Sequence, residues 1–259
     1  MGPRVHCIYK SSLRLRHYPG RLQTAKVVFI PKPGRRDLSD PASRRPISLL
    51  STIGKGLERL VAKRLAYAAL SKGVFSPQYI GAVPAIGVPD LVHALVHDLE
   101  ESRTKGLFTA VGLLDVEGGL NNVWHHLLTR RLESLGFADG LTRWVQSFLS
   151  LRTWSRGLPQ GSPLSPVLFM LYLSGVVRGR DSFGYVNDVL VKHNTRSPAA
   201  ARAGLAMKMS KVLEALTSLR YPVAPAKTEY FVVTPGATVP PEPLQVPGLP
   251  ALRPKSKIR

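Results

Sequence analysis

The sequence has one cysteine, few acidic residues and no long hydrophobic run, and each shortage excludes a class of protein. Cys7 has no second cysteine to pair with, so neither a disulfide scaffold nor a cysteine-based zinc cluster can form within the chain. No apolar run reaches the ~18 residues of a membrane-spanning helix. The best candidate, residues 164–177, is shorter and carries Pro166 near its start. We therefore expect no membrane association and an intracellular location, with the nucleus as one candidate compartment.

Acidic residues are scarce relative to basic ones, and the imbalance is concentrated near the N-terminus. The 259 residues include 36 Lys and Arg against 16 Asp and Glu, a formal net charge of +20. Residues 1–64 hold 15 of the basic residues and only 3 of the acidic ones. Such a surface attracts polyanions, of which nucleic acid is the commonest. The alternative is a basic protein whose charge serves only its solubility.

The 44% hydrophobic content is arranged in periodic segments that predict a mixture of helices and strands. The length suits one or two domains with a real core. We expect helices from Ser51 to Ala68 and over residues 89–101, 123–135, 139–150, 163–177 and 205–219. We expect strands over residues 25–30, 107–114 and 230–233, and a β-hairpin over residues 182–192. From Pro235 onward, 7 of 25 residues are proline without periodicity, which predicts a disordered basic tail.

Two aspartates lie at the ends of predicted strands. Asp115 closes the apolar run 107–114, and Asp188 lies in the predicted turn of the hairpin. The two carboxylates can meet if their strands are neighbours in one sheet, and paired carboxylates suit Mg²⁺ bound together with substrate phosphates. Magnesium in turn serves phosphoryl transfer. The alternative is that both aspartates only cap strand ends.

Six segments of the chain, in their order, resemble the motifs of reverse transcriptases, most closely those of non-LTR (LINE-like) retrotransposons. They are Lys26–Gly34, Arg45–Ser51, Leu114–Val123, Gly157–Pro166, Tyr185–Asp188 and Lys227–Glu229. The resemblance covers roughly residues 5–234, and the segment Gly-Leu-Pro-Gln-Gly-Ser-Pro-Leu-Ser-Pro at 157–166 is specific on its own.

The resemblance implies an α+β fold with the fingers and palm of a right-hand polymerase. The expected organisation is a basic lead-in over residues 1–24, a fingers-like region over 25–106, a palm-like region over 107–234 and the disordered Pro-rich tail over 235–259. We expect no thumb, and an incomplete palm sheet. The implied partners are an RNA template, a DNA primer and a deoxynucleoside triphosphate, with Mg²⁺ as cofactor.

The resemblance also implies roles for individual residues, each at a position that matches a family motif. The metal ligands would be the carboxylates of Asp115 and Asp188 and the backbone carbonyl of Val116. Lys227 would protonate the departing pyrophosphate, a general-acid role. The residues expected to contact nucleotide or template are Lys32, Arg45, Leu120, Gln160, Gly161 and Ser162. From the residues alone, three alternatives remain open: a solvated basic loop for Lys32 and Arg45, a tight turn without ligand for residues 160–162, and a surface lysine for Lys227.

The chain departs from the family pattern at several of these positions. Asn187 stands where active members have the first metal-binding aspartate of Tyr-x-Asp-Asp, and two divalent ions then face one carboxylate fewer. Leu120 replaces the aromatic residue used to exclude ribonucleotides, and Asn121 replaces an aspartate. The strand pair expected after residues 152–153 is nearly absent, because only residues 154–156 precede the glycine-rich turn.

Three hypotheses for function follow. The first is an RNA-directed DNA polymerase, a nucleotidyltransferase, whose activity is impaired or lost because of Asn187. The second is a non-catalytic nucleic-acid-binding pseudoenzyme that retains the basic fingers. The third is an unselected relic of a decaying transposon copy.

Overall fold

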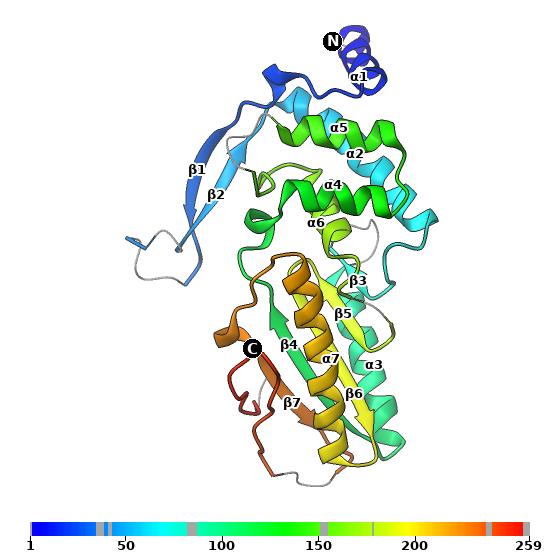
Figure 1. Ribbon diagram of the computed structural model, residues 1–259, viewed down its shortest axis with the longest axis vertical. Coiled ribbons are helices and arrows are strands. Elements are labelled where there is room, and N and C mark those ends of the chain that lie inside the picture. The colour runs from blue at the N-terminus through cyan, green and yellow to red at the C-terminus, as the bar shows by residue number, and fades with distance from the viewer. Residues whose placement is uncertain are drawn as a thin grey trace. The chain divides into compact units, whose positions relative to one another are not determined.

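The structure is a computed structural model that describes residues 2–34, 39–40, 43–81, 87–150, 155–177, 179–236 and 240–255. The chain divides into two compact units, each built from two separate segments. Residues 1–74 and 120–172 form the first unit, and residues 75–119 and 173–259 form the second (Figure 1). Both units therefore combine residues from the expected fingers-like and palm-like regions. Residues 151–154, next to the expected strand deletion, lie outside the described residues.

The first unit is mainly helical. Its helices are α1 (Gly2–Arg14), α2 (Thr52–Ser71), α4 (His125–Ser134), α5 (Asp139–Ser150) and α6 (Ser165–Leu173), and its strands are β1 (Lys26–Pro31) and β2 (Arg44–Leu49). The helices α2, α4, α5 and α6 agree with the periodicity of the sequence, whereas α1 was not predicted. The strands β1 and β2 pair antiparallel in a two-stranded ribbon, with Lys26 opposite Leu49.

The core of the first unit forms between α2, α5 and the N-terminal segment. Apolar residues of α2 at helical spacing, such as Leu57, Val61 and Leu65, are completely buried. Tyr18 is also buried and makes edge-to-face contacts with the rings of Trp144 and Phe148, at centroid distances of 5.3 and 5.2 Å. The lead-in before residue 25 therefore belongs to this core.

The second unit is a five-stranded sheet between two helices. The strands are β3 (Tyr79–Ile80), β4 (Phe108–Asp115), β5 (Ser182–Tyr185), β6 (Asp188–Thr195) and β7 (Glu229–Val233), and the helices are α3 (Val88–Thr104) and α7 (Pro198–Ser218). The order in the sheet is β3-β5-β6-β4-β7, with β3 parallel to β5 and every other pair antiparallel. The mixture of helices with a mostly antiparallel sheet agrees with the expected α+β class.

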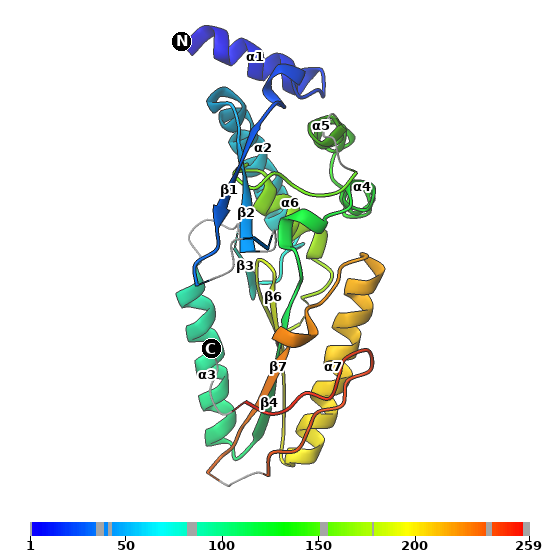
Figure 2. The same ribbon diagram turned by 90° about the vertical axis from the view of Figure 1, so that its left-hand side faces the viewer.

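The helices α3 and α7 lie on opposite faces of this sheet (Figure 2). The inner strand β4 is mostly buried because it has a neighbouring strand on each side and a helix on each face. At Gly112 of β4 the backbone comes very close to α7, since an added Cβ would lie 2.6 Å from the Met209 sulfur. Glycine at this position therefore lets α7 approach the sheet.

The predicted hairpin is present, with one difference. Tyr185 of β5 pairs with Asp188 of β6, so the two residues of the turn are Val186 and Asn187. Asp188 is thus the first paired residue of β6 rather than a turn residue. Its backbone position is fixed by the sheet, which favours a constant geometry for its carboxylate.

The prediction of a disordered tail is wrong for residues 240–255. Leu244, Val246 and Leu252 are buried, and the backbones of Leu244 and Leu252 exchange hydrogen bonds of 2.8 and 3.0 Å. The Lys255 N–H donates to the Tyr230 carbonyl of β7 at 2.9 Å. The tail therefore covers part of the free edge of β7, a contact that proline content and missing periodicity could not indicate. Among the described helices, none has the length and apolar composition needed to cross a membrane.

Candidate active site

The two predicted aspartates are brought together within the second unit. Asp115, the last residue of β4, is the direct partner of Asp188, the first residue of β6, in the antiparallel register. Directly paired residues of an antiparallel sheet have Cβ atoms about 4.5–5.5 Å apart. The condition under which the two carboxylates can meet, that their strands are neighbours in one sheet, is therefore met.

Two more side chains of the predicted set contact the Asp115 carboxylate. The Asn187 amide donates to Oδ1 of Asp115 at 3.1 Å. The Lys227 ammonium donates to Oδ2 and forms an ion pair with it. Asp115 is only 17% exposed, so its charge depends on these two partners more than a surface carboxylate would. Asp115, Asn187, Asp188 and Lys227 are named the acidic cluster from here on.

Backbone hydrogen bonds hold the members of this cluster in place. The Val116 N–H donates to the Asn187 carbonyl at 3.0 Å, which ties the end of β4 to the hairpin turn. The Ala224 N–H donates to the Asp115 carbonyl at 3.0 Å. The short 3-10 helix η4 (Pro225–Lys227) begins directly after Ala224. Its last residue, Lys227, therefore lies beside the Asp115 carboxylate.

The turn that carries Asn187 has a strained backbone. Val186 has a φ of +52°, a region that β-branched residues rarely adopt. The turn is held by its neighbours in the sheet. The buried Tyr79 hydroxyl donates to the Val186 carbonyl at 3.2 Å, and an added Cβ at Gly81 would lie 2.7 Å from a Val186 methyl group. The surrounding structure therefore fixes the turn in a conformation that valine alone would avoid.

The electrostatic environment distinguishes Asp188 from an ordinary aspartate. Partial burial of its carboxyl group and the negative charge of Asp115 raise the pKa of Asp188, and Lys227 opposes this rise. The cluster therefore contains one cation against two carboxylates, and a further positive charge would be favourable there.

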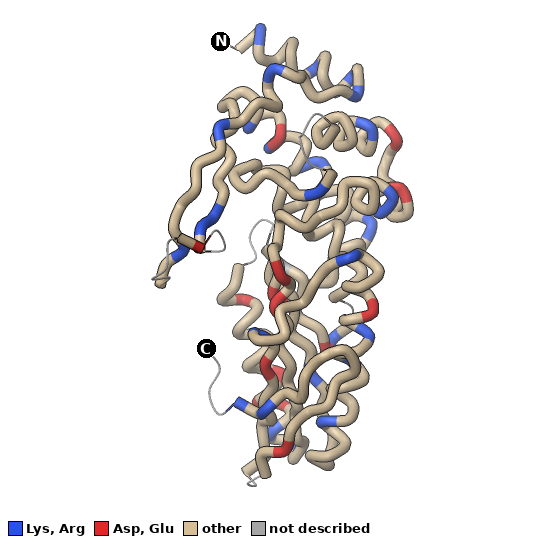
Figure 3. Tube along the Cα trace, turned by 60° about the vertical axis from the view of Figure 1, so that its left-hand side comes forward, with Lys and Arg blue, Asp and Glu red and all other residues tan. Residues whose placement is uncertain are grey.

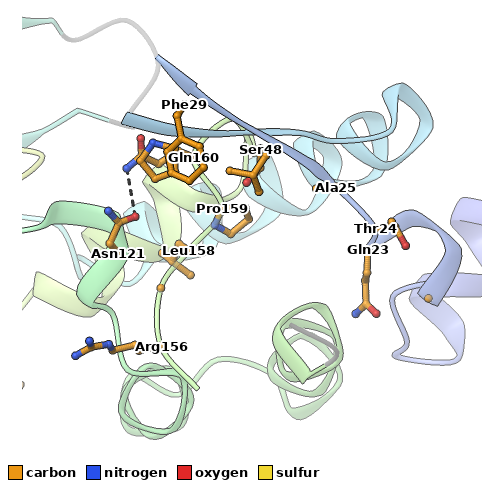
Figure 4. A pocket seen from close by; sticks show the side chains of 14 residues that line it. Gln23, Thr24, Ala25, Phe29, Ser48, Asn121, Arg156, Leu158, Pro159 and Gln160 are labelled. Atoms are coloured by element: carbon orange, nitrogen blue, oxygen red, sulfur yellow. Dashed lines mark hydrogen bonds between the residues drawn. The ribbon is translucent and has the colours of Figure 1, made fainter. Parts of the chain in front are cut away.

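The glycine-rich turn after residue 156 lies in the first unit, where it lines a pocket of about 750 Å³. Its lining includes Gln160 and Pro159 of the turn, Phe29 of β1 and Ser48 of β2 (Figure 4). The Gln160 amide donates to the Asn121 side chain at 3.3 Å across the pocket wall. The floor and walls combine apolar surface with amide groups, as nucleobase-binding sites do.

The other predicted contact residues of the first unit differ in their exposure. Gly161 is exposed with a φ of +110°, and an added Cβ would lie 2.8 Å from the Ser48 carbonyl oxygen. Leu120 is half-buried, and its carbonyl accepts a 2.7 Å hydrogen bond from the Leu158 N–H. Ser162 is only 4% exposed and its hydroxyl donates to Glu58, so it supports the turn instead of facing a ligand.

The two predicted basic residues lie on the ribbon of β1 and β2. Arg45 is an exposed residue of β2, and Lys32 follows β1 directly and is half-buried. Lys and Arg are also spread along α1, which contains no acidic residue (Figure 3). Basic charge thus extends from the N-terminus to the ribbon within the first unit.

Some polar groups near these features were missed in the sequence. Glu58 and Tyr18 are completely buried and hydrogen-bonded to each other, and Arg156 lines the pocket and lies 5.7 Å from the Trp124 ring centroid. The sequence did contain one indication of the first pair, because Glu58 lies on the apolar stripe of the helix predicted from Ser51 to Ala68. No local pattern pointed to Arg156.

A second cluster, on α3, has ligand atoms close enough to hold a metal. Side-chain atoms of His97, Asp98 and Glu101 lie within 4.8 Å of one another. However, Asp98 forms a 2.7 Å ion pair with the buried Lys192, and Glu101 pairs with Lys105 at 2.6 Å. Both carboxylates are therefore already neutralised by lysines.

Comparison with known proteins assigns the family. A sequence model of the family described as "Reverse transcriptase (RNA-dependent DNA polymerase)" matches residues 30–251. The RNA-directed DNA polymerase from mobile element jockey of Drosophila melanogaster is 29% identical over 223 residues, which is 76% of this chain and 24% of that protein. The jockey polymerase of Drosophila funebris is 30% identical over 64% of this chain and 19% of that protein. The chain therefore belongs to the reverse transcriptase family, and its relatives are polymerases of non-LTR retrotransposons.

Solved structures agree on the fold. The telomerase from Candida albicans, in complex with a fragment of telomeric RNA, has a TM-score of 0.54 and 14% identity, covering 97% of this chain and 50% of that one. The apo telomerase from Candida tropicalis, truncated from its C-terminal domain, has a TM-score of 0.55 and 11% identity, covering 89% of this chain and 53% of that one. The fold is thus polymerase-like. The chain spans about a fifth to a quarter of the length of the two jockey polymerases.

Proposed function

We propose that the chain is a reverse transcriptase domain of a non-LTR retrotransposon whose DNA-polymerising activity is impaired. The observation that carries this proposal is the engagement of both Asp115 carboxylate oxygens, one by the Asn187 amide and the other by Lys227. An aspartate at position 187 would leave that first oxygen unpaired and would add a charge. Asparagine instead pairs with that oxygen and adds no charge.

The residues of the cluster suit one magnesium ion better than two. Asp115, Asp188 and the Val116 carbonyl supply the hard oxygen donors that Mg²⁺ takes, together with waters and phosphates. Both Asp115 oxygens already accept a hydrogen bond, so a bound ion would have to share them with Asn187 and Lys227 or displace one of the two. Magnesium, when bound, lowers the pKa of the attacking hydroxyl and neutralises charge on the leaving pyrophosphate. Two carboxylates provide little compensation for a pair of divalent ions.

The other residues have assigned roles within this proposal. Lys32 and Arg45 bind the triphosphate of the incoming nucleotide, and Gln160 and Gly161 contact the template and the nucleotide. Lys227 protonates the departing pyrophosphate, and its contact with the Asp115 carboxylate supports a position close to the reacting phosphates. The fingers and palm assignments, the missing thumb and an incomplete palm sheet also belong to the proposal. An RNA template, a DNA primer and a deoxynucleoside triphosphate are the proposed partners.

The test is primer extension on a primed RNA template with deoxynucleoside triphosphates and Mg²⁺. We expect no extension by the unaltered protein and little by Asn187→Asp, because the residues missing before the glycine-rich turn also affect the enzyme. Asp115→Asn serves as the control that removes the central ligand. Robust extension by the unaltered protein would contradict the impairment.

A second candidate function is nucleic-acid binding without catalysis. It is favoured by the acid-free helix α1 and by the exposed Arg45, both in the first unit. Counterion release then dominates the affinity, so binding should weaken steeply as salt increases and persist in a chelator. Binding of labelled single-stranded RNA across a salt series measures this. Salt-independent binding, or no binding, would exclude it.

For an unselected relic that does not fold, circular dichroism would show no cooperative melt.

A further inference from the structure

A buried carboxyl group connects the N-terminal segment to the glycine-rich turn of the first unit. Glu58 on α2 is 0% exposed. Its Oε1 accepts a 2.7 Å hydrogen bond from the Tyr18 hydroxyl, and its Oε2 accepts a 2.5 Å hydrogen bond from the Ser162 hydroxyl. Both carboxyl oxygens are thus used, each by a residue from a different part of the chain.

The position of Glu58 is unusual for a glutamate. It lies on the inward stripe of α2 beside Leu57 and Val61, both completely buried. A buried carboxylate without partners is costly, and an aliphatic residue of similar volume is often neutral or stabilising there. Among the described residues, no ion pair involves Glu58. Its two hydroxyl partners therefore distinguish it from a simple packing residue.

The Ser162 end of this connection fixes the turn. The Ser162 hydroxyl oxygen also accepts the Leu164 N–H at 3.1 Å, so one side chain joins the turn to the start of α6 and to α2. Two residues earlier, the Gln160 carbonyl accepts a 2.7 Å hydrogen bond from the Ser48 N–H of β2. The turn is therefore held between β2 and Glu58, and the Gln160 side chain extends from it along the pocket (Figure 4).

The Tyr18 end belongs to a part of the chain outside the family match, which begins at residue 30. Tyr18 packs against Trp144 and Phe148, and its N–H donates to the Ser147 hydroxyl at 3.0 Å. Gly54 of α2 leaves room for the tyrosine, since an added Cβ would lie 2.7 Å from its hydroxyl oxygen. The N-terminal segment thus supplies a rigid support for the Glu58 carboxyl group.

We propose that Glu58 is a positioning residue for nucleic-acid binding, which acts through Ser162 to hold the Gln160–Gly161 turn against its ligand. Tyr18 fixes the orientation of the Glu58 carboxyl group from the other side. The inference deepens the proposed function and rests on it, since the ligand of the turn is the template strand. The N-terminal lead-in is then part of the template-binding apparatus.

The first test separates a positioning role from a stabilising one. Glu58→Leu should lower the melting temperature, because the buried hydroxyls of Tyr18 and Ser162 lose their acceptor. It should also accelerate hydrogen exchange of the amides over residues 158–164 by roughly tenfold or more, because the turn loses an anchor. Ser162→Ala should accelerate exchange in the same segment, and it keeps the proposal testable if Glu58→Leu does not fold.

Ser12→Ala is the matched control. Ser12 is a buried serine of the same unit that accepts the Trp144 indole N–H at 2.9 Å and donates to the His17 carbonyl at 2.5 Å. It should lower the melting temperature without accelerating exchange over residues 158–164. If exchange in that segment is unchanged in Glu58→Leu and Ser162→Ala, or rises equally in Ser12→Ala, the positioning role is refuted.

The second test measures binding of a fluorescent single-stranded RNA by anisotropy in a chelator. Glu58→Leu should weaken binding about tenfold, as expected for a loosened contact of one base, whereas Glu58→Gln, which keeps an acceptor oxygen, should recover part of the affinity. Equal affinity of Glu58→Leu and the unaltered protein would overturn the inference. If the unaltered protein does not bind, the proposed function fails, and the exchange comparison still decides whether Glu58 holds the turn.

Discussion

Asp115 and Asp188 face each other as direct partners in the pairing of β4 with β6. Neither belongs to a flexible loop, so their separation is set by the sheet. Asn187 and Lys227 contact the Asp115 carboxylate from two sides, whereas Asp188 forms no ion pair with any described residue. The negative charge of Asp115 is therefore compensated by its partners. The ionised form of Asp188 is disfavoured by burial and by the charge of Asp115, which is why the pKa of Asp188 is raised.

Restoring aspartate at position 187 should lower the stability of the metal-free protein and raise its affinity for Mg²⁺. Asn187→Asp places a third carboxylate beside Asp115 and Asp188, and like charges at this distance cost about 1 kcal/mol at a partly exposed site. In a chelator the variant should melt several degrees below the unaltered protein. Millimolar Mg²⁺ should reverse most of this loss, while the unaltered protein should respond weakly. Thermal unfolding with and without Mg²⁺ provides the measurement.

Asn194→Asp is the control for that experiment. Asn194 lies near the opposite end of β6 from the turn, and its amide donates to the Ser102 hydroxyl at 3.1 Å, away from the acidic cluster. The same chemical change there should not create a response to Mg²⁺. A similar response of both variants would assign the effect to general screening of charge and contradict a specific metal site.

Asp188→Asn should change the pH dependence of stability. The pKa of Asp188 is raised in the folded state, so folding favours the protonated carboxyl group. This contribution to the free energy of unfolding is fully present below the ordinary pKa of 3.8 and is lost as pH rises through the raised pKa. Removing the carboxylate removes this loss, so Asp188→Asn should be more stable than the unaltered protein near pH 7. The gain should stay below about 1 kcal/mol, since the carboxyl group is only partly buried and solvent screens its charge.

The check is a series of denaturant titrations in a chelator from acid to neutral pH. The difference between Asp188→Asn and the unaltered protein should disappear by about pH 3, below the ordinary pKa of 3.8, where the aspartate is mostly protonated in both states. A difference that persists at pH 3 would show that the amide changes contacts instead of ionisation.

Much of the fold could be predicted because local patterns carry it. The buried strand ending at Asp115 and the amphipathic helix α5 follow from hydrophobic spacing over 8 to 12 residues. The pairing of Asp115 with Asp188 needed one further assumption, that their strands are neighbours. The contact between Lys227 and Asp115 was not predictable from spacing, because it depends on the backbone hydrogen bond from Ala224.

The features that were missed are stabilised by distant partners. The two residues of β3 form a strand only because β5 lies beside them, and no pattern of length two can indicate this. The tail residues Leu244 and Leu252 lie among prolines without periodicity, yet both are buried. Glu58 was placed correctly in a helix, but its polar partners come from residues 40 and 104 positions away.

Gly112→Ala should destabilise the second unit through contact with α7. The new methyl group would lie 2.6 Å from the Met209 sulfur and 3.3 Å from its terminal methyl, and Met209 is completely buried. Overpacking of this kind costs about 1–3 kcal/mol. Met209→Ala alone should cost about 2–5 kcal/mol through the cavity it leaves. Urea unfolding of both single variants and of the double variant gives the comparison.

The double variant provides the internal control. If the two side chains compete for one space, Gly112→Ala combined with Met209→Ala should cost less than the sum of the single changes, by about 1 kcal/mol or more. If the two changes are strictly additive, the side chains at positions 112 and 209 do not compete for one space, and Gly112 does not set how closely α7 packs on the sheet.

Leu252→Asp should release the tail from the edge of β7. Leu252 is 5% exposed and exchanges two backbone hydrogen bonds with Leu244, so a buried charge there would favour detachment of the segment. The free edge of β7 then has unpaired N–H and C=O groups that other chains can use. We expect faster hydrogen exchange at the Lys255 amide, which donates to the Tyr230 carbonyl, and concentration-dependent association in light scattering.

The matched control is Gln245→Asp, which introduces the same charge at an exposed residue of the same segment. It should change stability by less than about 0.5 kcal/mol and leave the protein's association state unaltered. Because both variants carry one added negative charge, a difference between them reports burial and not net charge. Equal exchange of the Lys255 amide in both variants would mean that burial of Leu252 does not hold the Lys255–Tyr230 backbone contact, and that β7 is kept from association by other means.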